Sequence, residues 1–490
     1  MNTFIKNLIL LPALGANLVV VLTGTATAQT FTNLHDFGPA ITNGIYPAGG
    51  LIISSNTLFG TASGGGISGR GTVFAVNTDG SSFTNLYNFT EVGQGFTNSD
   101  GAGPQAGLLL AGGALYGTTP IGGSSGNGTV FAVNTDGSGF TNLYNFSALS
   151  ANTNSDGASP HAGLILSGNT LFGTAALGGS TGAGAVFRLN TDGTGFTNLY
   201  SFTATSDPLL MTNGDGAYPQ AGLVLSGNIL FGTTTGGGRS GNGTVFRLNT
   251  DGTAFTNLYA FTAASNSTNS DGGSPRAGLV LSGNTLYGTT FRNGISGRGT
   301  VFKVNTDGTG FMNLHSFLAV SGNNINSDGS YPYAGLVLSG NTLYGTAFSG
   351  GSYGNGTVFS VNTDGTAFTA LYSFSLVDTN SYTNSDGAFP YAGLVLSGNT
   401  LYGTAKNGGA ADDGTIFSLL VPPQLGISLY GTNIILTWPT NAAGYNLQYC
   451  TNLDAAPVWN AVHPGPDPVN GQNTVTNPIS GAWKFFRLKQ

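Results

Sequence analysis

Two short sequence phrases recur seven times in this chain, and their order constrains the fold more than any other feature. The phrase Pro-x-Ala/Gly-Gly-Leu begins at Pro47, Pro104, Pro160, Pro219, Pro275, Pro332 and Pro390. The phrase Phe-x-x-Leu-x-x-Phe begins at Phe31, Phe83, Phe140, Phe196, Phe255, Phe311 and Phe368. The chain therefore starts with the phrase that its last repeat, ending at Leu419, lacks. A closed ring explains this displacement, because the N-terminal strand completes the last unit and leaves no free sheet edge. The sequence predicts an all-β fold, a seven-bladed β-propeller closed by the N-terminal strand.

Each repeat predicts four antiparallel strands, as the fifth copy illustrates. Strands are expected at residues 278–281, 285–289, 300–304 and 311–317. A Gly-Asn pair separates the first two strands and Asn-Thr-Asp-Gly separates the last two, and both tolerate the positive φ angles of tight hairpins. Four strands in a period of 56 to 59 residues are typical of a propeller blade.

Loop lengths indicate which face of the ring carries any site. From each phrase-opening proline to the Asn of Asn-Thr-Asp-Gly there are 30 residues in six copies, and the next Phe follows 6 residues later. All variation in length lies between strand four of one unit and strand one of the next, a segment that we call the crossing loop. Because insertions are tolerated on surfaces and not inside a packed sheet, the crossing loop is expected at the surface. In a propeller it projects from the same face as the loop between strands two and three, and this face is expected to hold any site.

Residues 1–28 have the features of a secretory signal peptide. Lys6 precedes an apolar stretch from Leu8 to Leu22, and Ala26-Thr27-Ala28 fits a small-residue cleavage site. A membrane anchor is the alternative, but the stretch is short for a span and no second one follows it. The sequence predicts an exported protein, extracellular or at the cell surface, with no membrane span after cleavage of the signal.

Composition argues against several classes of function. Only 7% of the residues are charged, the net charge is −7 and there is no basic patch, so nucleic acid is not expected as a partner. Cys450 is the only cysteine, so no disulfide joins two parts of the chain. The 4 histidines are scattered and the repeats bring together no Ser/His/Asp set. The sequence favours a protein without catalytic residues and without a cofactor.

Six crossing loops contain the motif Asn-Ser/Gly-Asp-Gly, for which two interpretations are open. Asn and Asp oxygens suit calcium, a hard cation, although each loop supplies one carboxylate and lacks the Asp-x-Asp-x-Asp-Gly spacing. The interpretation that the sequence favours is an Asx-type turn, in which the carboxylate accepts a local backbone N–H. The candidate metal ligands are Asp100, Asp156, Asp215, Asp271, Asp328 and Asp386.

The residues that flank the phrase-opening prolines differ from copy to copy, although the repeat is otherwise uniform. Copies five to seven place aromatic residues there together with an arginine. Aromatic rings with a polar tip beside a guanidinium suit the stacking of a sugar ring, and the alternative is that they fill a tapering channel. The candidate ligand-binding residues near the channel mouth are Arg276, Tyr331, Tyr333, Phe389, Tyr391 and His161.

A second domain follows the repeats. Residues 421–423 are predicted to link the propeller, residues 29–420, to a small β-sandwich at residues 424–490, in which six short runs alternate in hydrophobicity. A domain of this size without disulfides needs large apolar side chains, so its tryptophans are expected to fill the core. These tryptophans are Trp438, Trp459 and Trp483.

The repeat unit, with its strings G-L-V-L-S-G-N-T-L-Y-G-T and G-T-V-F-x-V-N-T-D-G-T-x-F-T-N-L-Y-x-F, resembles the GloVer tandem repeat over residues 31–419. This resemblance implies an exported bacterial protein of the choice-of-anchor kind and implies no catalytic residue. The strand order is also similar to quinoprotein repeats, but these dock blades through a tryptophan that the array lacks, so no quinone is expected. The strings L-T-W-P, Y-N-L-Q-Y and F-F-R-L are similar to fibronectin type III-like tails, which implies a sorting or attachment module.

Together these features predict an exported, non-enzymatic propeller that binds an extracellular ligand, either a polysaccharide or a cell-surface partner. Two alternatives are open. A structural component of the cell surface or matrix fits the low charge and the near-identical repeats. A glycan lyase or hydrolase on the same face requires an acid and a base that converge at the channel mouth.

Overall fold

The computed structural model describes residues 8–10, 19–21, 29–38, 43–206, 211–423, 425–431, 433–439, 445–451, 458–469, 472–478 and 484–489. Within these ranges almost all regular structure is short β-strand, with two single-turn 3-10 helices, η1 (Gln94–Phe96) and η2 (Gly322–Asn324). The predicted all-β fold class is confirmed. None of the helices in the described ranges has the length and apolar character needed to cross a membrane.

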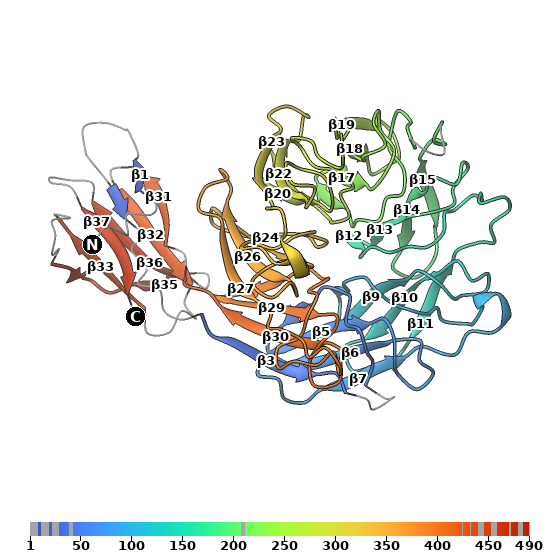
Figure 1. Ribbon diagram of the computed structural model, residues 1–490, viewed down its shortest axis with the longest axis horizontal. Helices are drawn as coiled ribbons and strands as arrows, with labels where there is room; N and C mark the ends of the chain where they lie inside the picture. The colour runs from blue at the N-terminus through green and yellow to red at the C-terminus, as the bar shows by residue number, and fades with distance from the viewer. Residues whose placement is uncertain are drawn as a thin grey trace.

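Within the described repeats, the strands β3 to β30 form seven four-stranded antiparallel sheets, which we call units 1 to 7 (Figure 1). Unit 1 has β4 (Ile52–Ser54), β5 (Thr57–Ala62), β6 (Thr72–Asn77) and β7 (Thr84–Asn88); unit 2 has β8 (Leu109–Ala111), β9 (Ala114–Thr119), β10 (Thr129–Asn134) and β11 (Thr141–Asn145); unit 3 has β12 (Ile165–Ser167), β13 (Thr170–Ala175), β14 (Ala185–Asn190) and β15 (Thr197–Ser201). Unit 4 has β16 (Val224–Ser226), β17 (Ile229–Thr234), β18 (Thr244–Asn249) and β19 (Thr256–Ala260); unit 5 has β20 (Val280–Ser282), β21 (Thr285–Thr290), β22 (Thr300–Asn305) and β23 (Met312–Ser316). Unit 6 has β24 (Val337–Ser339), β25 (Thr342–Ala347), β26 (Thr357–Asn362) and β27 (Thr369–Ser373); unit 7 has β28 (Val395–Ser397), β29 (Thr400–Ala405), β30 (Thr415–Leu420) and β3 (Phe31–Asp36).

The fourth strand of unit 7 comes from the N-terminal end of the repeats. β3 pairs antiparallel with β30, so that Phe31 lies opposite Leu419 and Asp36 lies opposite Thr415. The pairing continues beyond the strand, where the Phe37 N–H donates to the Gly414 carbonyl over 3.0 Å. β3 therefore occupies the edge of β30 that would otherwise be unpaired, which Figure 1 shows as a blue strand beside two orange ones.

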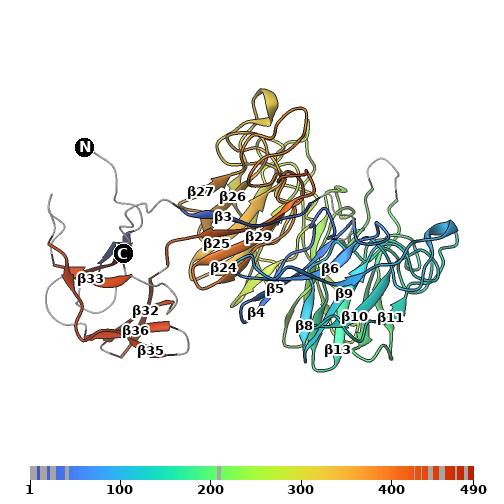
Figure 2. The same ribbon diagram turned by 90° about the horizontal axis from the view of Figure 1, so that it is seen from below.

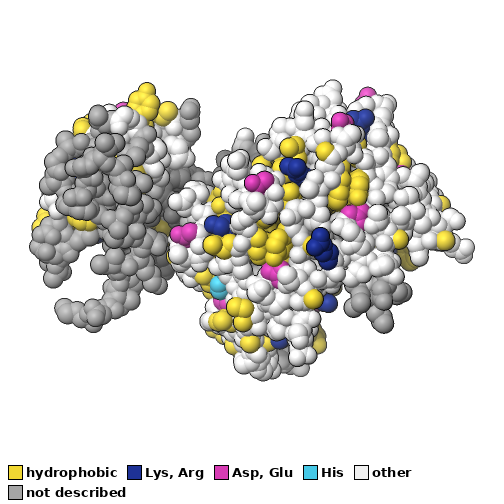
Figure 3. Space-filling model, turned by 90° about the horizontal axis from the view of Figure 1, so that it is seen from above, with side chains coloured by type: hydrophobic (Ala, Val, Ile, Leu, Met, Phe, Trp, Pro, Cys, Tyr) yellow, Lys and Arg dark blue, Asp and Glu magenta, His cyan; other side chains and the backbone are white. Residues whose placement is uncertain are grey.

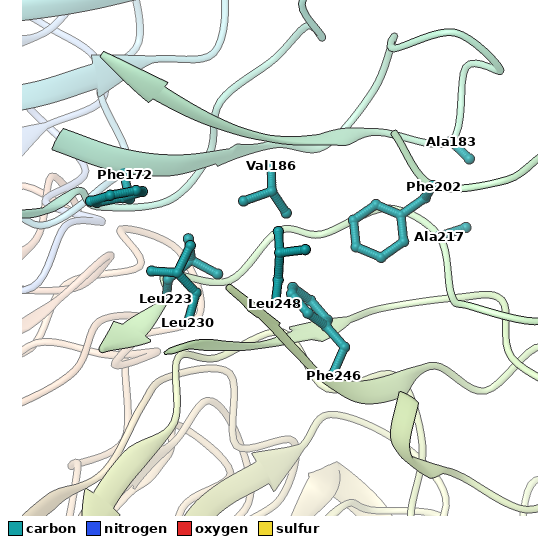
Figure 4. Packing of buried hydrophobic residues seen from close by; sticks show 9 residues of the cluster. All are labelled: Phe172, Ala183, Val186, Phe202, Ala217, Leu223, Leu230, Phe246 and Leu248. Atoms are coloured by element: carbon teal, nitrogen blue, oxygen red, sulfur yellow. The ribbon is translucent and has the colours of Figure 1, made fainter. Parts of the chain in front are cut away.

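The units pack against one another through phenylalanines of the repeated phrases. Phe311 of unit 5 stacks on Tyr259 of unit 4 with ring centroids 3.8 Å apart, and it also stacks on Phe302 of its own unit at 5.7 Å. Figure 4 shows one cluster between units 3 and 4, built from Phe172, Ala183, Val186, Phe202, Ala217, Leu223, Leu230, Phe246 and Leu248. Each fully buried phenylalanine contributes roughly 1.5 to 3 kcal/mol. The core is thus spread evenly between neighbouring sheets.

The glycine in the second strand of each unit makes room for this packing. A Cβ atom on Gly288 would lie 2.7 Å from Cζ of Phe302 and 2.8 Å from Cδ2 of Leu279. The same geometry recurs at Gly60, Gly117, Gly173, Gly232, Gly345 and Gly403. The Leu-Phe/Tyr-Gly-Thr string therefore follows from the need to seat a phenylalanine ring against the strand.

The residues after the repeats form two smaller sheets, of which β32, β33, β35 and β36 are seen apart from the units in Figure 2. One sheet has the order β31 (Gly426–Tyr430), β32 (Asn433–Pro439), β36 (Gln472–Pro478), β35 (Asp467–Val469), and the other has β34 (Asn460–Ala461), β33 (Asn446–Cys450), β37 (Phe485–Lys489). Trp438 is 1% exposed and lies in their common core, as the sequence predicted. Trp459 instead lies under the guanidinium of Arg487, 4.1 Å from its ring, and Trp483 lies outside the described residues.

Most of the predicted signal segment lies outside the described residues. Its described parts, β1 (Leu8–Leu10) and β2 (Val19–Val21), pair antiparallel in a two-stranded sheet.

Candidate functional site

The crossing loops lie against the loops between strands two and three, as the sequence predicted. In unit 5, Gly273 of the crossing loop exchanges backbone hydrogen bonds with Arg292, over 2.9 and 3.1 Å. Equivalent bridges occur at Ile45–Gly64, Ala102–Ile121, Ala158–Leu177, Ala217–Gly236, Ser330–Ser349 and Ala388–Asn407. These bridges fix the entry to the first strand of every unit.

A cavity of about 260 Å³ lies where the segments that lead into the first strands of all the units meet. Its size is close to the lower end of the range for small-ligand pockets, about 300 Å³. Glycines allow the close approach, since a Cβ on Gly163 would lie 2.8 Å from the Gly107 carbonyl oxygen. The residue that follows each phrase-opening proline lines the cavity, and these residues are Ala48, Gln105, His161, Gln220, Arg276, Tyr333 and Tyr391.

Units 5 to 7 bring Arg276, Tyr333 and Tyr391 into contact in the wall of this cavity. Nη1 of Arg276 donates to the Tyr333 hydroxyl over 2.8 Å. The Tyr333 and Tyr391 rings lie face to face with centroids 3.8 Å apart and a tilt of 32°. Because these two rings cover each other, they offer polar tips and edges to a ligand more than open faces, in contrast to the sugar-stacking platform that the sequence predicts.

The residue before each phrase-opening proline has an unusual backbone. Its φ is positive in every unit: 59° at Tyr46, 64° at Gly103, 53° at Ser159, 59° at Tyr218, 53° at Ser274, 59° at Tyr331 and 58° at Phe389. Left-handed backbone is disfavoured for bulky residues and costs about 1 to 3 kcal/mol. Two hydrogen bonds offset this cost at Tyr331, whose N–H donates to the Arg298 carbonyl of the preceding unit and whose carbonyl accepts from Phe348.

Tyr331 and Phe389 lie beside the cavity wall rather than in its lining. The Tyr331 hydroxyl accepts a hydrogen bond from Nη1 of Arg298, and the Phe389 ring stacks on Phe348 at 5.2 Å. Of the predicted ligand-binding residues, Arg276, Tyr333, Tyr391 and His161 therefore line the cavity, and Tyr331 and Phe389 form a supporting layer behind them.

Phe291 and Phe348, which are not among the residues predicted from the sequence, complete this layer. Phe291 lies 4.3 Å from Cζ of Arg276 and 5.3 Å from the Tyr333 ring. Both occupy the position after the second strand, which varies strongly while its surroundings do not. That column reads Ser63, Pro120, Ala176, Thr235, Phe291, Phe348 and Lys406. The variation at this column, in an otherwise uniform repeat, is the sequence signal that could have identified Phe291 and Phe348.

Burial shifts the pKa values of three side chains around the cavity. The pKa of His161 is lowered by burial, so the imidazole is neutral at pH 7. Burial also lowers the pKa of Lys406, whose Nζ lies 5.1 Å from the Tyr391 ring centroid. Burial and the neighbouring Tyr333 raise the pKa of Tyr391, which keeps its hydroxyl protonated. Arg276 is therefore the principal cation of the lining.

The aspartates of these crossing loops join the loop to the preceding fourth strand through hydrogen bonds, and we call this arrangement the clamp. Asp271, 3% exposed, accepts hydrogen bonds from the Tyr259 hydroxyl, the Thr262 N–H and the Thr262 hydroxyl, over 2.8, 2.9 and 2.6 Å. These donors belong to the end of the preceding fourth strand, so the carboxylate does not make the local Asx turn that the sequence predicts. The turn is made by Asn269, whose Oδ1 accepts from the N–H groups of Gly272 and Gly294.

The same clamp recurs in the other crossing loops with this motif. In each of them the carboxylate accepts from an aromatic side chain of the preceding fourth strand and from a backbone N–H just after it. The pairs are Tyr87–Asp100, Tyr144–Asp156, Tyr200–Asp215, His315–Asp328 and Tyr372–Asp386. Among the described residues, no three His, Cys, Asp or Glu side chains are grouped as metal ligands. Because donors of the protein already bond to the carboxylates of these crossing loops, none of these carboxylates is free to bind calcium.

His35 occupies the same column as these aromatics but lacks the carboxylate partner. Its ring stacks on Phe83 at 3.9 Å, while Nε2 is buried without a hydrogen-bond partner among the described residues. Burial lowers the pKa of His35, and Asp36 opposes this effect more weakly. His315 also stacks, on Phe368 at 3.6 Å, but its Nε2 bonds Asp328 over 2.9 Å.

We expect His35→Phe to make the protein less sensitive to acid. Because the folded state holds His35 below its usual pKa of 6.5, the unfolded state binds a proton more readily, and stability falls as the pH drops below about 6.5. Phenylalanine removes this loss and also the unsatisfied nitrogen, which stabilises the protein by about 1 kcal/mol at pH 7. Urea unfolding at pH 7 and pH 5 measures both effects. The matched variant His315→Phe should instead destabilise the protein, and stabilisation by both variants would contradict this account.

The fold and site together define a propeller-like, all-β repeat protein. The chain belongs to the Gloeobacter/Verrucomicrobia repeat family, whose model matches residues 17–211, 90–269, 147–322, 208–380 and 262–429. A search of curated proteins found no match.

Solved structures with some similarity include three enzymes. Oligogalacturonate lyase from Vibrio parahaemolyticus is 8% identical, with a TM-score of 0.46 over 81% of this chain and 95% of its own. An oligogalacturonate lyase in complex with manganese is 10% identical, with a TM-score of 0.45 over 81% and 94%. A puromycin-hydrolyzing peptidase from Mycobacterium tuberculosis is 12% identical, with a TM-score of 0.44 over 92% and 67%. At this level of similarity, none supports an argument about the function of this chain.

Proposed function

We propose that this protein is an exported, non-enzymatic binding protein whose seven units are the blades of a closed propeller. Closure is supported by the pairing of β3 with β30 and by the cavity to which every unit contributes a lining residue. Export is supported by the apolar stretch from Leu8 to Leu22 and the small-residue segment Ala26-Thr27-Ala28. The fibronectin type III-like C-terminal module would act in sorting or attachment, in keeping with the choice-of-anchor resemblance.

The ligand is proposed to be an extracellular saccharide that enters the central cavity. The observation that carries this proposal is the contact set of Arg276, Tyr333 and Tyr391, which breaks the uniformity of the ring on one side. Gln105 and Gln220 add amide donors and acceptors to the same lining. A polar, partly aromatic concave surface with few charges suits a ligand rich in hydroxyl groups.

Tyr391→Ala is expected to weaken saccharide binding by about 5- to 30-fold, because truncation of a central aromatic residue of a binding site costs about 1 to 2 kcal/mol. Isothermal titration of the full chain against a panel of soluble polysaccharides and their oligosaccharides measures this loss. The matched control is Tyr353→Ala, since Tyr353 is 49% exposed and outside the cavity lining. Unchanged binding by a folded Tyr391→Ala variant would reject this site, and a panel without any binder would favour the structural alternative.

A further inference from the structure

Arg276 is a guanidinium without an acidic partner in the wall of the cavity. Its Nη1 donates to the Tyr333 hydroxyl, and its Nε is buried with no hydrogen-bond partner among the residues that the structure describes. Among the described residues, the one ion pair within 4.0 Å is that between His315 in β23 of unit 5 and Asp328 in the crossing loop that leads to unit 6. Within the described part of the chain, no carboxylate therefore neutralises the positive charge of Arg276.

The surroundings hold this guanidinium in place. Its Cζ lies 4.3 Å from the Phe291 ring centroid and 5.0 Å from the Tyr333 ring centroid. Cation–π contacts with two rings fix the plane of the guanidinium and supply no hydrogen-bond acceptor. An arginine that is positioned in advance, and still has unused donors, is suited to a planar anion.

The rest of the lining is uncharged. No Asp or Glu is among the residues that line the cavity, although the chain carries 20 acidic and 13 basic residues. Nζ of Lys406, a residue outside the lining, lies 5.1 Å from the Tyr391 ring centroid. The lowered pKa of His161 leaves that side chain neutral. On the face in Figure 3, acidic side chains lie singly in a mostly uncharged surface. The cavity thus has the opposite sign of charge to the protein as a whole.

We propose that the cavity binds a sugar residue that carries a carboxylate, with Arg276 as the carboxylate-binding side chain. This inference rests on the proposed function and names the class of its ligand. The guanidinium fork matches the two carboxylate oxygens, while Gln105, Gln220 and the tyrosine hydroxyls meet the sugar hydroxyls. The volume of about 260 Å³ limits the bound part to about one sugar residue, such as the end of an acidic chain.

The test compares glucuronic acid, glucose and inorganic phosphate by isothermal titration with the full chain at one ionic strength. Glucuronic acid is expected to bind roughly 10- to 100-fold more tightly than glucose, because hydrogen bonds between charged groups are stronger than those between neutral groups. Arg276→Gln should abolish this preference and leave a weak affinity shared by both sugars. Arg239→Gln is the matched control, since it removes the same charge from an exposed loop of unit 4 and should leave the preference intact.

The outcomes separate this inference from the proposed function. If glucose and glucuronic acid bind equally and Tyr391→Ala weakens both, the acidic ligand is overturned while saccharide binding stands. If phosphate competes as well as glucuronic acid, the site is a general anion site and the carboxylated sugar is overturned. If glucuronic acid, glucose and the wider panel all fail to bind, the proposed function fails as well.

Discussion

Deletion of residues 29–37 is expected to lower the free energy of unfolding by roughly 6 to 10 kcal/mol and to cause aggregation. This segment carries Phe37, which is fully buried and packs on Phe74 of unit 1 at 5.4 Å. It also carries Phe31, which stacks on Tyr372 of unit 6 at 4.1 Å. Loss of each large aromatic residue from a core costs about 3 to 5 kcal/mol, and the deletion also exposes the edge of β30. Urea unfolding and gel filtration of chains that begin at residue 29 and at residue 38 measure the effect.

A synthetic peptide of residues 29–37 provides the control for this deletion. Added in trans, it should pair with the open edge of β30, restore the monomer and raise the urea midpoint, since strand addition uses the same main-chain hydrogen bonds. A scrambled peptide of the same composition should have no effect. If the shortened chain is monomeric with an unchanged urea midpoint, β3 does not hold the units together and the ring closure proposed above is rejected.

The strands of the units could be predicted from the sequence because their signals are local. The second strand of unit 5 was expected at residues 285–289 and is Thr285–Thr290, since alternating apolar residues end at turns that only a few residue types can form. The prediction missed β35, Asp467–Val469, in the C-terminal module. This short strand contains a proline and is exposed at all three residues, so it has neither the composition nor the alternation of a core strand.

The residues of the candidate site could be predicted only at positions where the repeats differ in sequence. Variation at one column identified Arg276 and Tyr333, and the fold brings this column to one cavity. The mutual stacking of Tyr333 and Tyr391 could not be predicted from the sequence, because it depends on the distance between neighbouring units. The role of Asp271 was assigned wrongly for a similar reason, since its partners Tyr259 and Thr262 lie outside the motif that contains it.

Asp271→Ala is expected to lower the free energy of unfolding by about 3 to 6 kcal/mol. The substitution removes three hydrogen bonds to a buried carboxylate, which come from the half-buried Tyr259 and from the N–H and the hydroxyl of the exposed Thr262. Each hydrogen bond to a charged group contributes about 1.5 to 3 kcal/mol, and water replaces part of this loss at Thr262. The loss also frees the crossing loop that leads to Arg276, so saccharide binding should weaken together with stability. Urea unfolding followed by tyrosine fluorescence, with titration of the folded fraction, measures both.

Asp307 of the same unit is the matched control for Asp271. Its Oδ1 accepts from the Thr309 N–H over 2.9 Å and from the Thr309 hydroxyl over 2.7 Å, in the exposed Asn-Thr-Asp-Gly turn. Water replaces these hydrogen bonds when Asp307 is changed to alanine, so a much smaller loss of stability is expected there. The two aspartates differ in burial and in what they join: one closes a turn between adjacent strands, whereas the other ties a fourth strand to the loop that enters the next unit. Equal urea midpoints for the two variants would show that the clamp does not stabilise the junction between units.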